Sequence, residues 1–245
     1  MRLRDLVEHP AERFESVGLH SALVDAELLA GHILGLNRGE VQAQMLVGAS
    51  VSESQAQQIT TLYGRRIARE PLQHITGTAY FRNLELSVGR GVFIPRPETE
   101  SVAELAIQAL RAVPGEPIAV DLCTGSGAIA IAMATEVPNA EVFAWELNPD
   151  SESFLRSNIT KYGDRVQLTM GDIADDSGFA SLVGQVSVVI SNPPYIPKDA
   201  IPRDLEVREH DPALALYGGD DGMDIMRIVS KRALELLVPG GFLVV

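Results

Sequence analysis

The strongest constraint on the fold of this chain is the alternation of strand-like and helix-like segments that begins at residue 118. Short apolar runs predict strands at residues 118–122, 141–145, 166–170, 186–191 and 242–245. Helical composition between them predicts helices at 128–136, 149–161 and 222–237. Parallel neighbours in a sheet need crossover connections, which are usually helices. The alternation therefore predicts an α/β fold with a Rossmann-like, doubly wound parallel sheet.

Residues 1–71 predict a small α-helical domain. Apolar residues recur at near-helical spacing from Leu3 to Val17, although Pro10 is expected to interrupt this first helix. Cap residues and apolar stripes predict further helices at 22–34 between Ser21 and Gly35, at 40–46, and at 53–70 after the capping pair Ser52 and Gln55. The histidines of this segment are isolated, so we expect the domain to make contacts and to carry no chemistry.

Residues 72–95 predict a β-hairpin linker, because apolar residues alternate there with glycine and asparagine. A helix is expected to follow through residue 113. Pro97 suits its first turn, and Glu98 suits the positive end of its dipole. Two interpretations of Arg96 and Glu98 stay open at this point: a local cap with an ion pair, or a turn that lies beside a bound cofactor. Residues 96–245 would then form the third and largest domain.

Composition excludes several classes of protein. The net charge of the 245 residues is −13, which argues against a broad grip on nucleic-acid phosphates. Cys123 is the one cysteine, so an internal disulfide is excluded and a reducing compartment is favoured. We find no leader peptide, no apolar run long enough to span a membrane and no metal-ligand spacing. We therefore expect a cytoplasmic protein that binds neither membrane nor metal.

The predicted strand at 186–191 is followed by a stiff loop, Asn192, Pro193, Pro194 and Tyr195. Ligands of open α/β sheets bind at the carboxyl ends of strands. The prolines fix φ and remove two N–H donors. A planar –NH2 group could therefore be held by two acceptors, the Asn192 side-chain oxygen and the Pro193 carbonyl, with Tyr195 as an aromatic platform. The alternative is an ordinary proline-rich turn.

The predicted strand at 118–122 leads into a glycine turn of Cys123, Thr124, Gly125, Ser126 and Gly127. The turn resembles a nucleotide-binding loop, although the third glycine of the dinucleotide fingerprint is replaced by Ala130. A Gly-x-Gly pattern is weak alone, and its position between a strand and a helix strengthens it.

Acidic residues follow the next two predicted strands, Glu146 after the second and Asp172 after the third. Glu146 could accept hydrogen bonds from ribose hydroxyls, and Asp172 could accept one from an adenine amino group. No basic clamp for a pyrophosphate lies nearby. The set therefore favours a nucleoside without phosphates, S-adenosylmethionine, over NAD.

The combination of this glycine turn with Asn192–Tyr195 resembles the class I methyltransferases that modify amide or amino nitrogens. Within that class, the strings Pro71-Leu-Gln-His-Ile-Thr-Gly77 and Ile94-Pro-Arg-Pro-Glu-Thr-Glu100 are similar to those of the peptide chain release factor glutamine methyltransferases. The helical segment before them and Gly240-Gly-Phe-Leu-Val-Val245 also match, so the resemblance covers nearly the whole chain.

The resemblance implies a helical domain that docks the release factor, a hairpin, and a methyltransferase domain. It implies methyl transfer from S-adenosylmethionine, with S-adenosylhomocysteine as product, to the side-chain amide nitrogen (N5) of the glutamine in a Gly-Gly-Gln tripeptide. Asn192, Pro193, Pro194 and Tyr195 would hold that glutamine. The implied cofactor contacts are Cys123, Thr124, Gly125, Ser126 and Gly127 (methionine part), Glu146 (ribose), Asp172 and Ile173 (adenine), with Asn192, Arg96 and Thr99 beside them.

This sequence departs from the family pattern in two places. Glu146 stands where many relatives have aspartate, and a final antiparallel strand pair is not found after Val245. The runner-up interpretation is a DNA or RNA amino-methyltransferase acting on adenine N6 or cytosine N4, since such enzymes share Asn-Pro-Pro-Tyr. The net charge argues against it. A scaffold that binds cofactor without catalysis is a third interpretation. We expect a monomer whose partner is a release factor, with no direct contact to nucleic acid.

Overall fold

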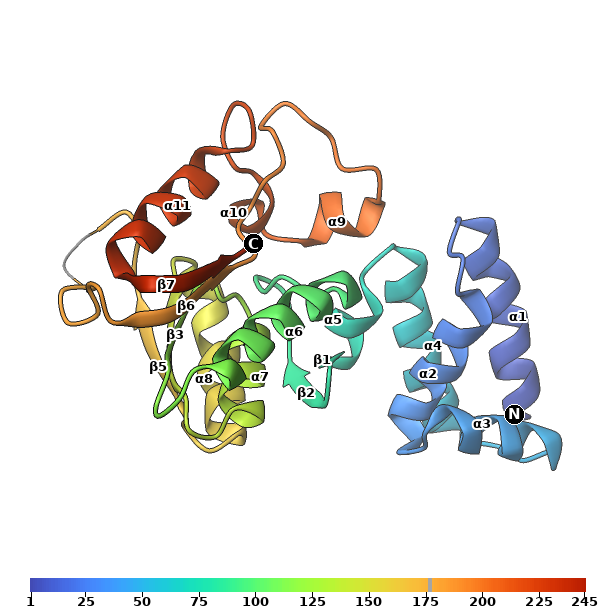
Figure 1. Cartoon of the computed structure of the whole chain (residues 1–245). Coiled ribbons are helices and arrows are strands. Elements are labelled where there is room, and N and C mark those ends of the chain that lie inside the picture. Colours follow the sequence, from blue (N-terminus) through green and yellow to red (C-terminus); the bar gives the residue numbers. More distant parts are fainter. Residues whose placement is uncertain (176–177) are drawn as a thin grey trace. The chain divides into compact units, whose positions relative to one another are not determined.

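The computed structural model describes residues 1–175 and 178–245, which form two compact units, residues 1–77 and 78–245 (Figure 1). Each unit has a hydrophobic core of its own. The assignment of 1–71, 72–95 and 96–245 as three separate domains stays a prediction.

The first unit consists of helices. They are α1 (Leu3–Ser16), α2 (Ala22–Leu34), α3 (Arg38–Leu46), α4 (Glu53–Ile67) and α5 (Leu72–Thr76). Their apolar stripes meet in one core, where Phe14 of α1 and Tyr63 of α4 make an edge-to-face contact with ring centroids 5.5 Å apart. The predicted capping box of α4 is confirmed, because Ser52 and Gln55 bond reciprocally. Gly35 ends α2 in the left-handed region, as predicted.

Pro10 does not interrupt the first helix, and that expectation was wrong. It lies inside α1, which runs unbroken from Leu3 to Ser16. Proline removes one backbone hydrogen bond. Buried residues on both sides of it, including Val7 and Ala11, hold the helix against the core. Ser21 stands at the start of α2, but its hydroxyl bonds to the Asp25 carboxylate and leaves the backbone uncapped.

The second unit contains a parallel sheet in the order β5-β4-β3-β6-β7. Its strands are β3 (Ile118–Leu122), β4 (Glu141–Glu146), β5 (Val166–Met170), β6 (Val186–Ser191) and β7 (Leu237–Val244). The chain moves outward from β3 to β5 and then returns to the other side of β3 with β6. The strand order therefore reverses between β3 and β6, where doubly wound sheets bind ligands. The predicted fold class is confirmed.

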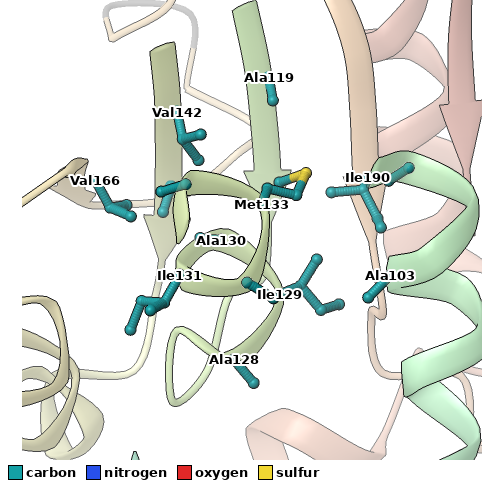
Figure 2. Packing of buried hydrophobic residues seen from close by; sticks show 14 of the residues in the cluster. Ala103, Ala119, Ala128, Ile129, Ala130, Ile131, Met133, Val142, Val166 and Ile190 are labelled. Atoms are coloured by element: carbon teal, nitrogen blue, oxygen red, sulfur yellow. The ribbon is translucent and has the colours of Figure 1, made fainter. Parts of the chain in front are cut away.

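Helices cover both faces of this sheet (Figure 1). The helices of this unit are α6 (Pro97–Ala112), α7 (Ala128–Glu136), the 3-10 turn η1 (Pro149–Ser151), α8 (Glu152–Lys161), α9 (Leu205–His210), α10 (Ala213–Leu216) and α11 (Asp224–Leu236). On one face, the α7 side chains Ile129 and Met133 lie in the same cluster as Val142 and Ile190 of the strands (Figure 2). On the other face, α11 packs over Trp145 and Phe179, whose rings stack at 4.2 Å. Residues 128–134 of α7 are all apolar and all buried, as expected for a helix that is packed on every side.

Several boundaries differ from the expectations. The helix expected at 53–70 ends at Ile67. The hairpin is shorter than residues 72–95, with β1 at Thr78–Phe81 and β2 at Leu84–Ser87, because α5 occupies its first residues. The last strand begins at Leu237 and not at Phe242, since Pro239-Gly240-Gly241 forms a bulged part of β7 opposite β6. The segment 196–221, for which no helix was predicted, contains α9 and α10.

Candidate functional site

The carboxyl ends of the central strands surround a cavity of about 470 Å³ in the second unit. This volume is within the usual range for small-molecule sites. The cavity brings together all the predicted site residues except Gly127: Arg96, Thr99, Cys123, Thr124, Gly125, Ser126, Glu146, Asp172, Ile173, Asn192, Pro193, Pro194 and Tyr195.

The glycine turn after β3 is held in an unusual backbone conformation. Cys123, Gly125 and Gly127 all have positive φ, at 63°, 59° and 84°. A side chain on Gly127 would meet Leu155 Cδ1 at 2.7 Å. Gly127 is therefore needed for close packing under the turn, which explains why it does not line the cavity.

Asp121 ties the turn to the start of α7. Its Oδ2 accepts from Thr124 Oγ1 at 2.6 Å and from the Ala130 N–H at 3.1 Å. Its Oδ1 is buried and has no partner among the described residues. Complete burial, opposed by these two hydrogen bonds, raises the pKa of Asp121 to about 7. Burial and the nearby Glu146 carboxylate raise the pKa of Cys123 to about 12, so its thiol stays protonated at neutral pH.

Glu146 joins the turns that follow β3 and β4. It is 9% exposed, and its Oε2 accepts from the Gly125 N–H at 2.7 Å while its Oε1 accepts from the Asn148 N–H at 2.7 Å. Each carboxylate oxygen can accept more than one hydrogen bond, so both keep capacity for ligand hydroxyls. Asp172 is exposed at the end of β5, where its Oδ1 accepts from the Ala174 N–H at 2.8 Å. Ile173 beside it is buried.

All four residues of the loop after β6 line the cavity. Asn192 is half-buried, Pro193 and Pro194 are buried, and Tyr195 is 64% exposed at the cavity. Asn192 Nδ2 donates to Thr99 Oγ1 at 3.3 Å. In the parts of the chain that the structure describes, no hydrogen bond reaches Asn192 Oδ1 or the Pro193 carbonyl.

Two glycines that sequence reasoning missed fix the backbone of this loop. A side chain on Gly218 would meet the Pro194 carbonyl oxygen at 2.5 Å, and one on Gly222 would meet the Tyr195 carbonyl oxygen at 2.3 Å. The Gly218 N–H also donates to the Ile196 carbonyl at 2.9 Å. Only residues without a Cβ allow this approach. The adjacent glycines Gly218 and Gly219, with Gly222 at the start of the predicted helix, were the available signal in the sequence.

Arg96 pairs with a residue that the sequence did not single out, Asp211. The Nη2–Oδ2 distance is 2.8 Å, and the Arg96 guanidinium lies 5.1 Å from the centroid of the Phe93 ring. Burial raises the pKa of Asp211, and Arg96 opposes that rise. Asp211 Oδ1 has no partner within the described residues. The pair links the turn before α6 to the segment that carries α10, which also lines the cavity.

The remaining wall is mostly apolar and was not predicted. Its side chains include Phe93, Val102, Ile129, Leu147, Leu214, Leu216, Tyr217 and Ile225. These residues come from segments far apart in the chain, and no local pattern joins them.

The charge of the lining fits a cationic nucleoside. Among the described residues that line the cavity, Glu98, Glu146 and Asp172 are acidic and Arg96, already paired with Asp211, is the basic one. An excess of carboxylates favours a ligand that carries a sulfonium and an ammonium group over one that carries phosphates. No cluster of His, Cys, Asp and Glu that could hold a metal ion occurs in residues 1–175 and 178–245. Across the same ranges, no helix has the length and apolarity needed to cross a membrane.

The site combines three features. A glycine turn lies where the strand order of the parallel sheet reverses, the acidic residue Glu146 ends β4, and Asn-Pro-Pro-Tyr follows β6. Together they define a Rossmann-like methyltransferase. Family models agree. Residues 5–77 match the PrmC N-terminal domain, and residues 84–207 match the methyltransferase small domain.

Sequence identity to known relatives shows which methyltransferase family this is. The chain is 48% identical to the release factor glutamine methyltransferase of Streptomyces coelicolor over 98% of this chain and 82% of the relative. It is 41% identical to that of Bifidobacterium longum, over 100% of this chain and 86% of the relative. It is 42% identical to that of Mycolicibacterium smegmatis, over 98% of this chain and 82% of the relative. The chain belongs to the release factor glutamine methyltransferase family.

Proposed function

We propose that this protein transfers a methyl group from S-adenosylmethionine to the side-chain amide nitrogen of the glutamine in the Gly-Gly-Gln tripeptide of peptide chain release factors. The observation that carries the proposal concerns Asn192 Oδ1 and the Pro193 carbonyl. Neither accepts a hydrogen bond from the described residues, and both belong to residues that line the same cavity as the glycine turn and Glu146. A primary amide offers two N–H hydrogens, which matches two acceptors.

The bound cofactor would supply an electrophilic methyl group on a sulfonium, which is a good leaving group. The turn Cys123–Gly127 would pass its methionine part, Glu146 would accept from its ribose, and Asp172 with Ile173 would meet its adenine. The acidic side chains of the lining outnumber the basic ones among the described residues, where Arg96 is already paired with Asp211, and this supports the assignment.

The residues of this chain would act mainly by orientation. An amide nitrogen is a poor nucleophile because its lone pair is delocalised into the carbonyl. Two acceptors on its hydrogens raise its electron density and point the lone pair at the methyl group. They also oppose the positive charge that develops on nitrogen as the N–C bond forms and the S–C bond breaks, so their effect grows in the transition state. The nitrogen then loses a proton to water, and no side-chain base is required.

The helical unit, residues 1–77, would dock the release factor. Because release factors act in translation, the enzyme would act in the cytoplasm. The enzyme would act as a monomer. A nucleic-acid substrate is not supported. The net charge of −13 opposes it, and the relatives reported above carry the name of a protein methyltransferase.

The test is transfer of a labelled methyl group to purified, unmethylated release factor. A Gln→Ala variant of the Gly-Gly-Gln tripeptide and an unmethylated DNA serve as parallel substrates. We expect label on the wild-type factor alone. Label on DNA, or equal label on the Gln→Ala factor, would refute the proposed function.

A further inference from the structure

The geometry points to Thr99 as a positioning residue for Asn192, a role that rests on the proposed function. The two side chains come from positions 93 residues apart, Thr99 in the first turn of α6 and Asn192 in the loop after β6. Asn192 Nδ2 donates to Thr99 Oγ1 at 3.3 Å, and both residues line the cavity.

Thr99 is itself held in place. Its N–H donates to the Arg96 carbonyl at 3.0 Å, and Pro97 opens the helix with a fixed φ. Arg96 is anchored by the ion pair with Asp211 and by the face of Phe93. The backbone of Thr99 is therefore held at the start of α6, and its hydroxyl meets Asn192 from that position.

The orientation of Asn192 matters because the two ends of a carboxamide have nearly the same shape and opposite hydrogen-bonding character. With Nδ2 bonded to Thr99, Oδ1 is the end left to accept from the substrate amide. A carboxamide turned by half a rotation would present an N–H donor to the N–H donors of the substrate. The hydrogen bond to Thr99 therefore holds the Asn192 carboxamide with Nδ2 toward α6 and leaves Oδ1 for the substrate amide.

This role differs from a contact with the cofactor, which the family resemblance implied for Thr99. A cofactor contact would change the affinity for S-adenosylmethionine when the hydroxyl is removed. A positioning role would change kcat for methyl transfer and leave that affinity unaltered, because Asn192 acts on the substrate nitrogen.

The experiment compares Thr99→Val, which keeps the shape and removes the acceptor, with Thr99→Ser, which keeps the acceptor. We expect Thr99→Val to lower kcat on unmethylated release factor about tenfold, equivalent to about 1.4 kcal/mol. Thr99→Ser should restore most of that loss. The Kd for S-adenosylmethionine, measured by titration calorimetry, should stay within about twofold of the wild type in both variants.

Thr135→Val is the matched control, since Thr135 is a half-buried helical threonine of α7 outside the cavity. It should leave kcat unchanged. An unchanged kcat in Thr99→Val would overturn the proposal, and so would an affinity for S-adenosylmethionine that falls in parallel with activity.

A nitrogen-15 NMR spectrum separates this proposal from the proposed function. The side-chain NH2 signal of Asn192, assigned by its loss in Asn192→Ala, should shift and exchange faster in Thr99→Val and stay in place in Thr135→Val. An unmoved signal would refute the positioning role even if the wild type methylates release factor. If the wild type transfers no methyl group while the signal moves as expected, the proposed substrate is wrong and the side-chain contact stands.

Discussion

Among single residues, Asn192 should have the largest effect on catalysis. Asn192→Ala removes an acceptor that strengthens its hold on the substrate nitrogen as positive charge develops there. Removal of one group of this kind lowers kcat by about 100-fold or more. The Kd for S-adenosylmethionine should change by less than about threefold, because Glu146 and the glycine turn stay in place.

The measurement is single-turnover methyl transfer beside calorimetric cofactor binding. Asn139→Ala is the control, since Asn139 is exposed and its side chain donates to the Gly115 carbonyl, outside the cavity. Turnover that survives in Asn192→Ala would contradict the model of two acceptors.

Asp121 should make the stability of the protein depend on pH. Its pKa is raised from 3.8 to about 7 by burial, so between those values the folded chain holds more protons than the unfolded chain. The free energy of unfolding must then fall as pH rises from about 4 to about 7. The displaced pKa corresponds to about 4 kcal/mol over that window.

Asp121→Asn should remove this contribution, because the amide stays neutral. Urea denaturation of both proteins at pH 4, 5.5, 7 and 8 would show a difference in unfolding free energy that moves in favour of the variant as pH rises. The exposed Asp199→Asn should show no such trend. Parallel pH profiles for the wild type and Asp121→Asn would disprove the assignment.

The sequence was most informative about side chains that directly follow strands. Cys123, Glu146 and Asn192 were singled out because strand ends converge at one edge of a parallel sheet, whatever the rest of the fold does. Asp211 was missed because its partner, Arg96, lies 115 residues away and nothing local marks the pairing. The contact between Thr99 and Asn192 was missed for the same reason.

Among elements, the loop after β6 depends on a segment that lies against it. Gly222 has a φ of 78° and leaves no room for a Cβ, which would meet the Tyr195 carbonyl oxygen at 2.3 Å. Gly222→Ala should therefore displace the loop and lower kcat by about 100-fold, the usual effect of a misplacement near 1 Å.

Gly115→Ala is the matched control. Gly115 also has a positive φ, 85°, but a Cβ there would meet nothing within 4 Å. Both variants should lose about 1 kcal/mol of stability through the left-handed backbone. Gly222→Ala should lose more than this through the clash, and it alone should lose activity. Equal kinetics for the two variants would show that the close approach is unimportant.

A helix or strand was predicted accurately where its own residues show a clear apolar pattern, and poorly where they do not. The runs at 118–122 and 186–191 coincide with β3 and β6, because strands in the interior of a parallel sheet are mostly continuous apolar runs. The run at 166–170 coincides with the edge strand β5, where the apolar residues Val166, Leu168 and Met170 alternate with polar ones. The helices α9 and α10 span 6 and 4 residues, too short to show a helical period. The first residues of β7 contain Pro239, Gly240 and Gly241, which are turn residues by composition and strand residues only because β6 lies beside them.

For the whole molecule, the presence of two cores predicts that the two units can be destabilised separately. Ile59 of α4 is fully buried in the core of residues 1–77. Ile59→Ala should reduce the stability of that unit by about 2–5 kcal/mol through a lost side chain and a cavity. The affinity for S-adenosylmethionine should stay unchanged, because the proposed cofactor contacts all lie in residues 78–245.

Transfer to intact release factor should nevertheless fall in Ile59→Ala, since the helical unit is proposed to dock that partner. Ile159→Ala, in the core of the second unit, should have the opposite pattern and weaken cofactor binding first. The measurement is calorimetric melting of each variant with and without S-adenosylmethionine, beside methyl transfer. If Ile59→Ala also abolishes cofactor binding, the two cores do not fold independently. If it unfolds the helical unit and leaves transfer intact, that unit does not dock the substrate.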